Sequence, residues 1–71
     1  MTKAIQVRIK SNTTPGLYLE GIDAILGVSI AHVGQNPPWF KLREAAKMVN
    51  YLNELESLDG YVKHEWKIVK A

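Results

Sequence analysis

The alternation of hydrophobic and polar residues is clearest at the start of the chain. The apolar positions are Ile5, Val7 and Ile9, and the polar positions between and after them are Gln6, Arg8 and Lys10. This period of two predicts a β-strand over residues 4–10 with one face in water. The next residues, SNTTPG at 11–16, end in Pro15 and Gly16, which favour a turn. Because LYLE at 17–20 resumes strand character, we expect a first hairpin.

Residues 21–34, GIDAILGVSIAHVG, fit two patterns. Their apolar positions keep a helical spacing, whereas their β-branched residues and Gly27 favour a strand. We predict a strand at about 24–33, with helix as the alternative. In the strand, Leu26, Val28 and Ile30 would form a bulky face, and Gly27, Ser29 and Ala31 a small one.

A long amphipathic helix is predicted to begin near Pro38, because Pro38 disfavours the α region for Pro37. Its covering side would consist of Trp39, Leu42, Ala45, Ala46, Val49 and Leu52. The sequence LDG at 58–60 would end it. We assign Trp39 to the core.

A second alternating segment at 61–69 places Val62, His64, Trp66 and Ile68 opposite Lys63, Glu65 and Lys67. It predicts a half-exposed strand. Half-exposed strands are usually antiparallel, so we predict an α+β fold. A sheet of three to four antiparallel strands would be covered on one face by the single long helix, in the order ββ(β)αβ.

The composition bounds the classes of function. The 71 residues are expected to form a single domain, 1–71, too small for a large enclosed active site. The absence of cysteine excludes disulfides and thiolate metal sites, and suits a cytoplasmic protein. The N-terminal residues do not resemble a signal peptide, and no apolar run has the length of a membrane span. The net charge of +2 is too small to indicate nucleic-acid binding by itself.

The charges of the predicted helix oppose its dipole, because cations lie near its start and acids near its end. Such local violations concentrate at functional sites. Three apolar side chains would also point outward beside the cations. The expected partner-binding surface consists of Phe40, Lys41, Arg43, Lys47, Tyr51 and Leu58. A salt-bridged solvent surface is the plainer interpretation, and capture of a small phosphorylated ligand by Lys41 and Arg43 is a further alternative.

The open face of the predicted sheet is a second candidate site. Its residues would be Gln6, Arg8, Lys10, Tyr18, Tyr61, Lys63 and Lys67, which are basic or aromatic except for Gln6. Cations suit phosphates and rings suit bases, so this surface is typical of nucleic-acid binding. A lysine-rich solvent face that only keeps the sheet soluble has the same composition.

Catalysis and metal binding find little support. Asp23, Ser29 and His32 have the residue types of a hydrolytic triad, but Ser29 and His32 would point to opposite sides of a strand. His64 is expected to be a hydrogen-bonded core residue. The two histidines lack metal-ligand spacing. We therefore expect no catalytic residues, no metal and no cofactor.

These observations predict a non-enzymatic binding module. We expect an inhibitor or accessory protein, of the kind that mobile elements encode, which binds a protein partner through the helix surface. Homodimerisation is a variant of this prediction, and nucleic-acid binding through the sheet face is the alternative.

Overall fold

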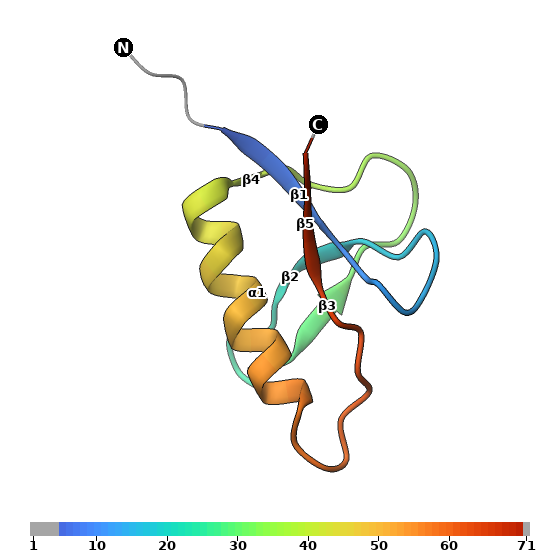
Figure 1. Ribbon diagram of the computed structural model, residues 1–71. Coiled ribbons are helices and arrows are strands. Elements are labelled where there is room, and N and C mark those ends of the chain that lie inside the picture. Colours follow the sequence, from blue (N-terminus) through green and yellow to red (C-terminus); the bar gives the residue numbers. More distant parts are fainter. Residues whose placement is uncertain (1–4, 71) are drawn as a thin grey trace.

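Residues 5–70, which this computed structural model describes, form five strands and one helix (Figure 1). The elements are β1 (Gln6–Lys10), β2 (Leu19–Ile22), β3 (Ser29–Ala31), β4 (Phe40–Lys41), α1 (Leu42–Glu56) and β5 (Lys67–Lys70). Ala4, at the start of the first predicted strand, lies outside the described residues. The predicted α+β class is confirmed. Within residues 5–70, no helix has the length and apolar character needed to cross a membrane.

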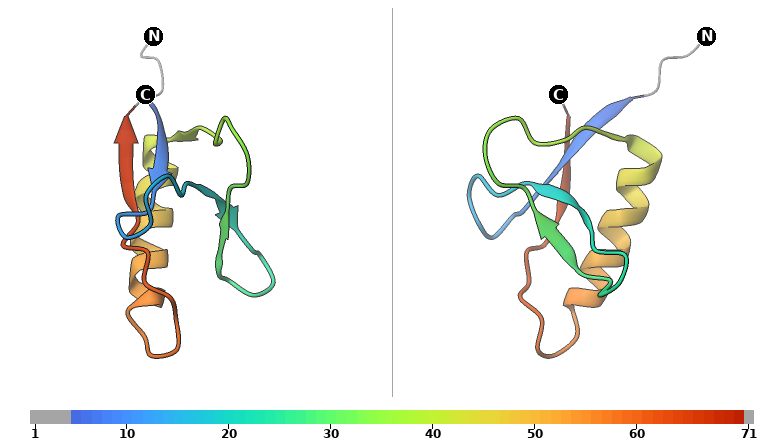
Figure 2. Two further views of the ribbon diagram at one scale, coloured as in Figure 1. Left: turned by 90° about the vertical axis from the view of Figure 1, so that its right-hand side faces the viewer. Right: turned by 180° about the vertical axis from the view of Figure 1, so that it is seen from behind.

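The strands form two antiparallel sheets. The first has the order β4-β1-β5, and the second pairs β2 with β3. The helix α1 lies on one side of the three-stranded sheet, and the connection between β3 and β4 lies on the other (Figures 1 and 2). Within residues 5–70, this second face of the sheet is therefore covered by no helix.

The core lies between β1, α1 and the β2–β3 hairpin. Its buried apolar residues are Val7, Ile9, Leu19, Ala45, Leu52 and Trp66. Val7 and Ile9 alternate with exposed or half-buried neighbours, as the period of two predicts. This core is small, which suits a chain of this size.

The predicted hairpin between residues 4–10 and 17–20 is wrong, because the two segments share only one isolated bridge. Tyr18 pairs with Lys10 in an isolated bridge, after which the chain turns away and β2 pairs with β3. The turn itself is confirmed, because the Ser11 N–H donates to the Leu17 carbonyl at 2.8 Å and Gly16 has a φ of 77°. The central strand β1 instead pairs with β4, from the middle of the sequence, and with β5, from near its end.

The strand predicted at 24–33 is reduced to β3, at residues 29–31. A turn occupies the preceding residues, where the Asp23 carboxylate accepts hydrogen bonds from the N–H groups of Ile25 and Leu26, both at 2.8 Å. Gly27 takes a φ of 70°, which a strand residue does not adopt. The predicted bulky face is wrong because Leu26 points into solvent from this turn.

The helix begins at Leu42, four residues after the predicted start. Pairing with β1 extends residues 40 and 41, and places Phe40 opposite Val7. Phe40 packs against the core, so its predicted outward position is wrong. Trp39, predicted to be in the core, is 41% exposed. Tertiary pairing has here overridden the local helix signal at Pro38.

The last predicted strand forms only at its C-terminal half. Residues 61–66 are irregular, and Glu65 has a φ of 52°. The side chain of Asn53 replaces a neighbouring strand: its Oδ1 accepts from the Trp66 N–H at 2.8 Å, and its Nδ2 donates to the Trp66 carbonyl at 2.9 Å. These backbone groups are therefore satisfied by α1 and need no sheet.

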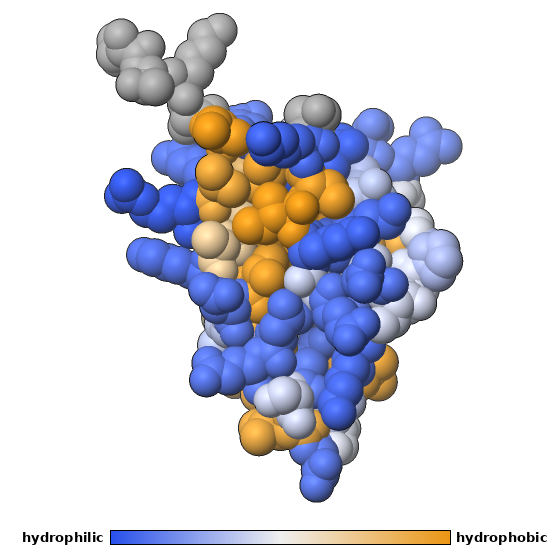
Figure 3. All heavy atoms as spheres, in the orientation of Figure 1, coloured by the Kyte–Doolittle hydropathy of each residue, from blue (hydrophilic) through white to orange (hydrophobic). Residues whose placement is uncertain are grey.

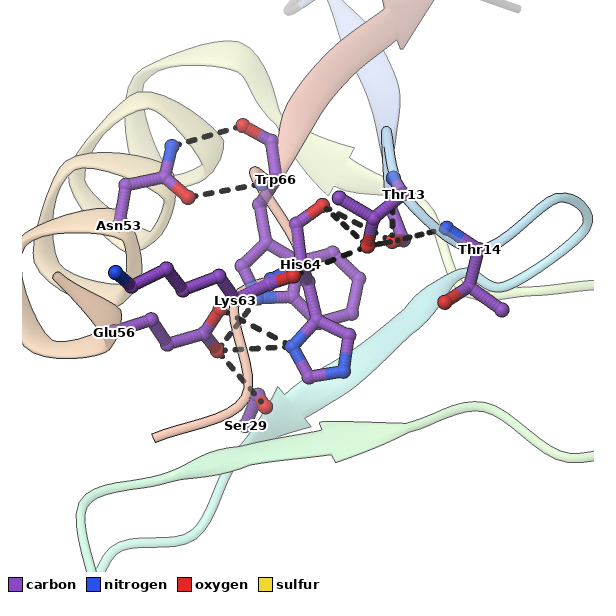
Figure 4. Close-up of polar contacts among 9 residues, drawn as sticks. Thr13, Thr14, Ser29, Asn53, Glu56, Lys63, His64 and Trp66 are labelled. Carbon is purple, nitrogen blue, oxygen red and sulfur yellow. Dashed lines mark hydrogen bonds and ion pairs between the residues drawn. The ribbon is translucent and has the colours of Figure 1, made fainter. Parts of the chain in front are cut away.

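The carboxylate of Glu56 attaches this segment to the end of α1 (Figure 4). It accepts from the His64 N–H at 2.9 Å and from the Trp66 indole Nε1–H at 3.0 Å. His64 Nδ1 lies 3.1 Å from one carboxylate oxygen, and Ser29 Oγ of β3 donates to the other at 3.4 Å. The imidazole of His64 stacks on the Trp66 ring, with centroids 4.6 Å apart. The predicted hydrogen bonding of His64 is confirmed, although its side chain lies at the margin of the core and not within it.

Replacement of Glu56 by alanine should destabilise the protein by about 2–4 kcal/mol, because the buried Trp66 indole N–H and the partly buried His64 N–H would lose their acceptor. Urea unfolding followed by circular dichroism measures the effect. Glu54→Ala removes an exposed carboxylate from the same helix turn and should change stability by less than about 0.5 kcal/mol. Equal effects of the two substitutions would contradict the structural role of Glu56.

Candidate functional site

The register of the three-stranded sheet determines which side chains share its uncovered face. In antiparallel pairs, directly opposed residues lie on the same side. Gln6 is opposite Lys41, Arg8 is opposite Val69, and Lys10 is opposite Lys67. Trp39 continues the alternation of β4, and Tyr18 faces Lys10 through the isolated bridge. We call this surface the outward face: Gln6, Arg8, Lys10, Tyr18, Trp39, Lys41, Lys67 and Val69.

The outward face is cationic and carries two aromatic rings. Its cations are Arg8, Lys10, Lys41 and Lys67, and none of its residues is an aspartate or glutamate. Lys41 and Lys67 are exposed, and Trp39 is 41% exposed. Because the strands hold these side chains in fixed rows, positive charge and flat apolar surface occur side by side.

The centre of the outward face is a stacked pair, Arg8 and Trp39. The guanidinium carbon of Arg8 lies 3.9 Å from the centroid of the Trp39 ring. Arg8 Nε also donates a hydrogen bond of 3.2 Å to the Pro37 carbonyl. These two contacts fix the arginine and hold the indole ring beside it, so the pair is preorganised as a cation–π platform.

A weaker pair of the same kind lies at the end of β1. The ammonium of Lys10 is 5.9 Å from the centroid of the Tyr18 ring. Lys10 also faces Lys67 across the β1–β5 pairing, and two opposed cations repel each other. A bound anion between them would relieve this repulsion.

The sequence-based list of sheet-face residues is partly reproduced. The structure brings together Gln6, Arg8, Lys10, Tyr18 and Lys67 as expected. Tyr61 and Lys63 do not join them, because they lie in the irregular segment after α1. Sequence reasoning missed Trp39 and Lys41, which it placed in a helix. The sequence did contain a signal for this placement, because Trp39 and Lys41 flank Phe40 as alternating strand residues would.

A histidine and a glutamate lie beside this face. The register of β2 against β3 shifts between Leu19 and Gly21, where Glu20 lies, and the distance from Glu20 Oε1 to His32 Nδ1 is 2.6 Å. His32 Nε2 lies 3.1 Å from the Gln35 carbonyl. Both ring nitrogens therefore face acceptors, which the imidazolium form alone can satisfy at once. The hydrogen bond to Glu20, followed by that to Gln35, raises the pKa of His32 above its ordinary value.

The residues predicted for partner binding on the helix are spread over α1 and its ends. Phe40 points into the core, whereas Arg43 and Lys47 are exposed on α1. Tyr51 is 45% exposed, and its hydroxyl donates to the Gly27 carbonyl at 2.7 Å. Leu58 is 56% exposed in the turn after α1. A role of this set in protein binding remains a prediction.

A groove lies beside the start of α1, which we call the helix-start groove. It is lined by Ile5, Lys41, Leu42, Arg43, Glu44 and Ala46, and its volume is about 610 Å³. Ile5 is 56% exposed and Leu42 is 39% exposed. Figure 3 shows an apolar strip along α1, bordered by hydrophilic atoms, that begins at the end where β1 starts. The lining of the groove therefore combines three apolar side chains with two cations and one acid.

The residues with triad chemistry are not assembled into one site. Ser29 contacts Glu56, His32 contacts Glu20, and the Asp23 carboxylate accepts from two backbone N–H groups. The Glu56 carboxylate is itself satisfied by several donors, although a hollow of about 420 Å³ lies beside it. Among residues 5–70, no group of three or more potential metal-binding side chains occurs.

The His32 contact should be visible in the pH dependence of the protein. Because the folded pKa is raised, this contact stabilises the fold fully below the unfolded pKa of about 6.5. The contribution is lost as pH rises through the folded pKa. An NMR titration of the His32 ring should give a pKa above 6.5, and Glu20→Gln should lower it. Glu54→Gln is the control and should leave the His32 pKa unchanged. The same His32 pKa in Glu20→Gln and in the wild type would contradict the role of Glu20.

The chain was also compared with protein-family models, with curated proteins and with solved structures, and no match was found in any of them. The function is therefore argued from the geometry of these surfaces.

Proposed function

We propose that this protein binds single-stranded nucleic acid on the outward face. The observation that supports this proposal is the Arg8–Trp39 pair, 3.9 Å apart, in a row of strands that also presents Lys10, Lys41 and Lys67. The lysines would neutralise phosphates, and the exposed indole would stack on a base.

A single strand suits this surface better than a duplex. Bases in a duplex are stacked on one another, so Trp39 and Tyr18 could not reach their faces. A sheet with aromatic residues instead receives splayed bases, and its cations follow the backbone. Among residues 5–70, the helix α1 lies on the other side of this sheet, so it cannot enter a major groove from the outward face.

Trp39→Ala should weaken binding of a labelled single-stranded oligonucleotide by roughly 5- to 150-fold, because stacking on one base contributes about 1–3 kcal/mol. Fluorescence anisotropy measures the affinity. The intrinsic fluorescence gives a second signal, because Trp39 is exposed whereas Trp66 is 2% exposed. Binding should quench Trp39 emission, and Trp39→Phe should remove this change. Unchanged affinity in Trp39→Ala would contradict the stacking role.

Reversal of two cations tests the electrostatic part of the proposal. The double variant Lys10→Glu and Lys67→Glu should weaken binding. It should also reduce the slope of log affinity against log salt concentration by the amount expected for about two phosphate contacts. The variant Arg43→Glu and Lys47→Glu makes the same change in net charge on exposed helix positions and should retain more affinity. Equal losses would indicate a non-specific charge effect. Absence of binding at low salt would refute the proposal.

A second candidate function is binding of a protein partner at the helix-start groove. The groove supports it because exposed Ile5 and Leu42 lie beside the cations Lys41 and Arg43. Apolar centres with arginine at the margin are typical of protein interfaces. The matching ligand would be an acidic segment with aliphatic side chains.

A peptide-display selection on the wild-type protein tests the groove. We expect acidic peptides with paired aliphatic residues, and we expect Arg43→Glu to weaken them at least about tenfold. Lys70→Glu, at an exposed position of β5 outside the groove, is the control. Selected peptides without acidic residues, or equal affinity for both variants, would count against this function.

A further inference from the structure

The turn between β2 and β3 presents two aliphatic side chains to solvent. Ile25 is 94% exposed and Leu26 is 74% exposed. Such exposure of adjacent large apolar residues has no role in the core of this protein, and it favours a contact with another surface.

The turn is held rigidly, although its tip is exposed. Asp23 accepts the N–H groups of Ile25 and Leu26 through its side chain, and its own carbonyl accepts the Gly27 N–H at 2.8 Å. The Tyr51 hydroxyl then fastens the Gly27 carbonyl to α1 at 2.7 Å. A tip that is already ordered loses little conformational entropy when it is bound.

The charge close to this tip is negative. Between residues 11 and 36, the acidic residues are Glu20 and Asp23, and there is no lysine or arginine. Glu20 is paired with His32, so Asp23 supplies the negative charge beside the tip. The two backbone hydrogen bonds lower the pKa of Asp23, so this carboxylate is charged at neutral pH. The tip is thus apolar, convex and flanked by acid.

The helix-start groove has the complementary properties. It is concave, it has the apolar floor of Ile5, Leu42 and Ala46, and Lys41 and Arg43 exceed its single acid, Glu44. Its volume of about 610 Å³ is in the range of roughly 300–1,000 Å³ typical of sites for small organic ligands. Two aliphatic side chains are small enough to enter a groove of this volume.

We infer that the occupant of the helix-start groove is the 23–28 turn of a second copy of this chain. Ile25 and Leu26 of one copy would lie on the apolar floor of the next, with Asp23 near Lys41 and Arg43. This inference depends on the second candidate function, because it names the ligand of that groove. It does not depend on nucleic-acid binding.

The contact would join copies head to tail. The turn is attached to α1 by the hydrogen bond from the Tyr51 hydroxyl. Tyr51 is nine residues after Leu42, which corresponds to about 13 Å along α1 at the helical rise of 1.5 Å per residue. The turn and the groove are therefore different surfaces, and one copy offers both. A contact of this type is heterologous and leaves a turn and a groove unoccupied at the two ends of each assembly.

The association should be weak, because one turn in one groove buries less than the roughly 1,200 Å² of a standard interface. Sedimentation equilibrium of the wild-type protein should show a mean mass that rises with concentration, with a dissociation constant of roughly 0.1–1 mM. Leu26→Asp and Arg43→Glu should each weaken this association at least about tenfold. Val62→Asp and Lys70→Glu make closely similar chemical changes at exposed positions outside both surfaces and should associate like the wild type.

Mixing the two impaired variants tests the head-to-tail arrangement directly. Leu26→Asp keeps an intact groove and Arg43→Glu keeps an intact turn, so an equimolar mixture should form a one-to-one heterodimer and nothing larger. Circular dichroism confirms that each variant is folded. A wild-type protein that stays monomeric at millimolar concentration overturns the inference, and so does a mixture that forms no heterodimer. If acidic peptides nevertheless bind the groove, the second candidate function survives and only its ligand is wrong.

Discussion

The attachment of the C-terminal segment to the end of α1 by Glu56 is the interaction on which the fold depends. A carboxylate at a helix C-terminus opposes the dipole, at a cost of about 0.3–1 kcal/mol when it is exposed. Here it is 5% exposed, and it accepts from His64, Trp66 and Ser29. Hydrogen bonds to a charged group contribute about 1.5–3 kcal/mol each, so the bonds outweigh the dipole.

These bonds join three parts of the chain. Trp66 enters the core, β5 follows directly and pairs with β1, and Ser29 brings β3 to the same carboxylate. The pairing of β5 with β1 in turn places Lys67 beside Lys10. The position of Lys67 on the outward face therefore depends on the Glu56 contacts, which lie on the helix side of the sheet. The charge of Glu56 opposes the helix dipole, but its carboxylate has a structural role.

The two candidate binding surfaces use different properties of the same small fold. The outward face relies on strand register, which aligns cations and aromatic rings in rows. The helix-start groove and the 23–28 turn rely on exposed apolar side chains at opposite parts of α1. Lys41 belongs to both the face and the groove, because it is the last residue of β4 and the N-cap of α1. Self-association and nucleic-acid binding would thus meet at this residue.

The sequence by itself determined the elements whose pattern is local. The alternation of Val7 and Ile9 with polar neighbours produced β1, the apolar spacing of Ala45 and Leu52 produced the buried side of α1, and the α+β class followed. Five of the seven residues expected on the basic sheet face were also found there.

Tertiary structure alone decided the remaining features, because each depends on a partner distant in sequence. Phe40 is a strand residue because residues 40 and 41 pair with the edge of β1. This pairing also places Trp39 on the outward face. Residues 61–66 remained irregular because Asn53 and Glu56 satisfied their backbone groups. Local propensity cannot predict such choices, since the free energy that decides them comes from pairing and burial across the fold.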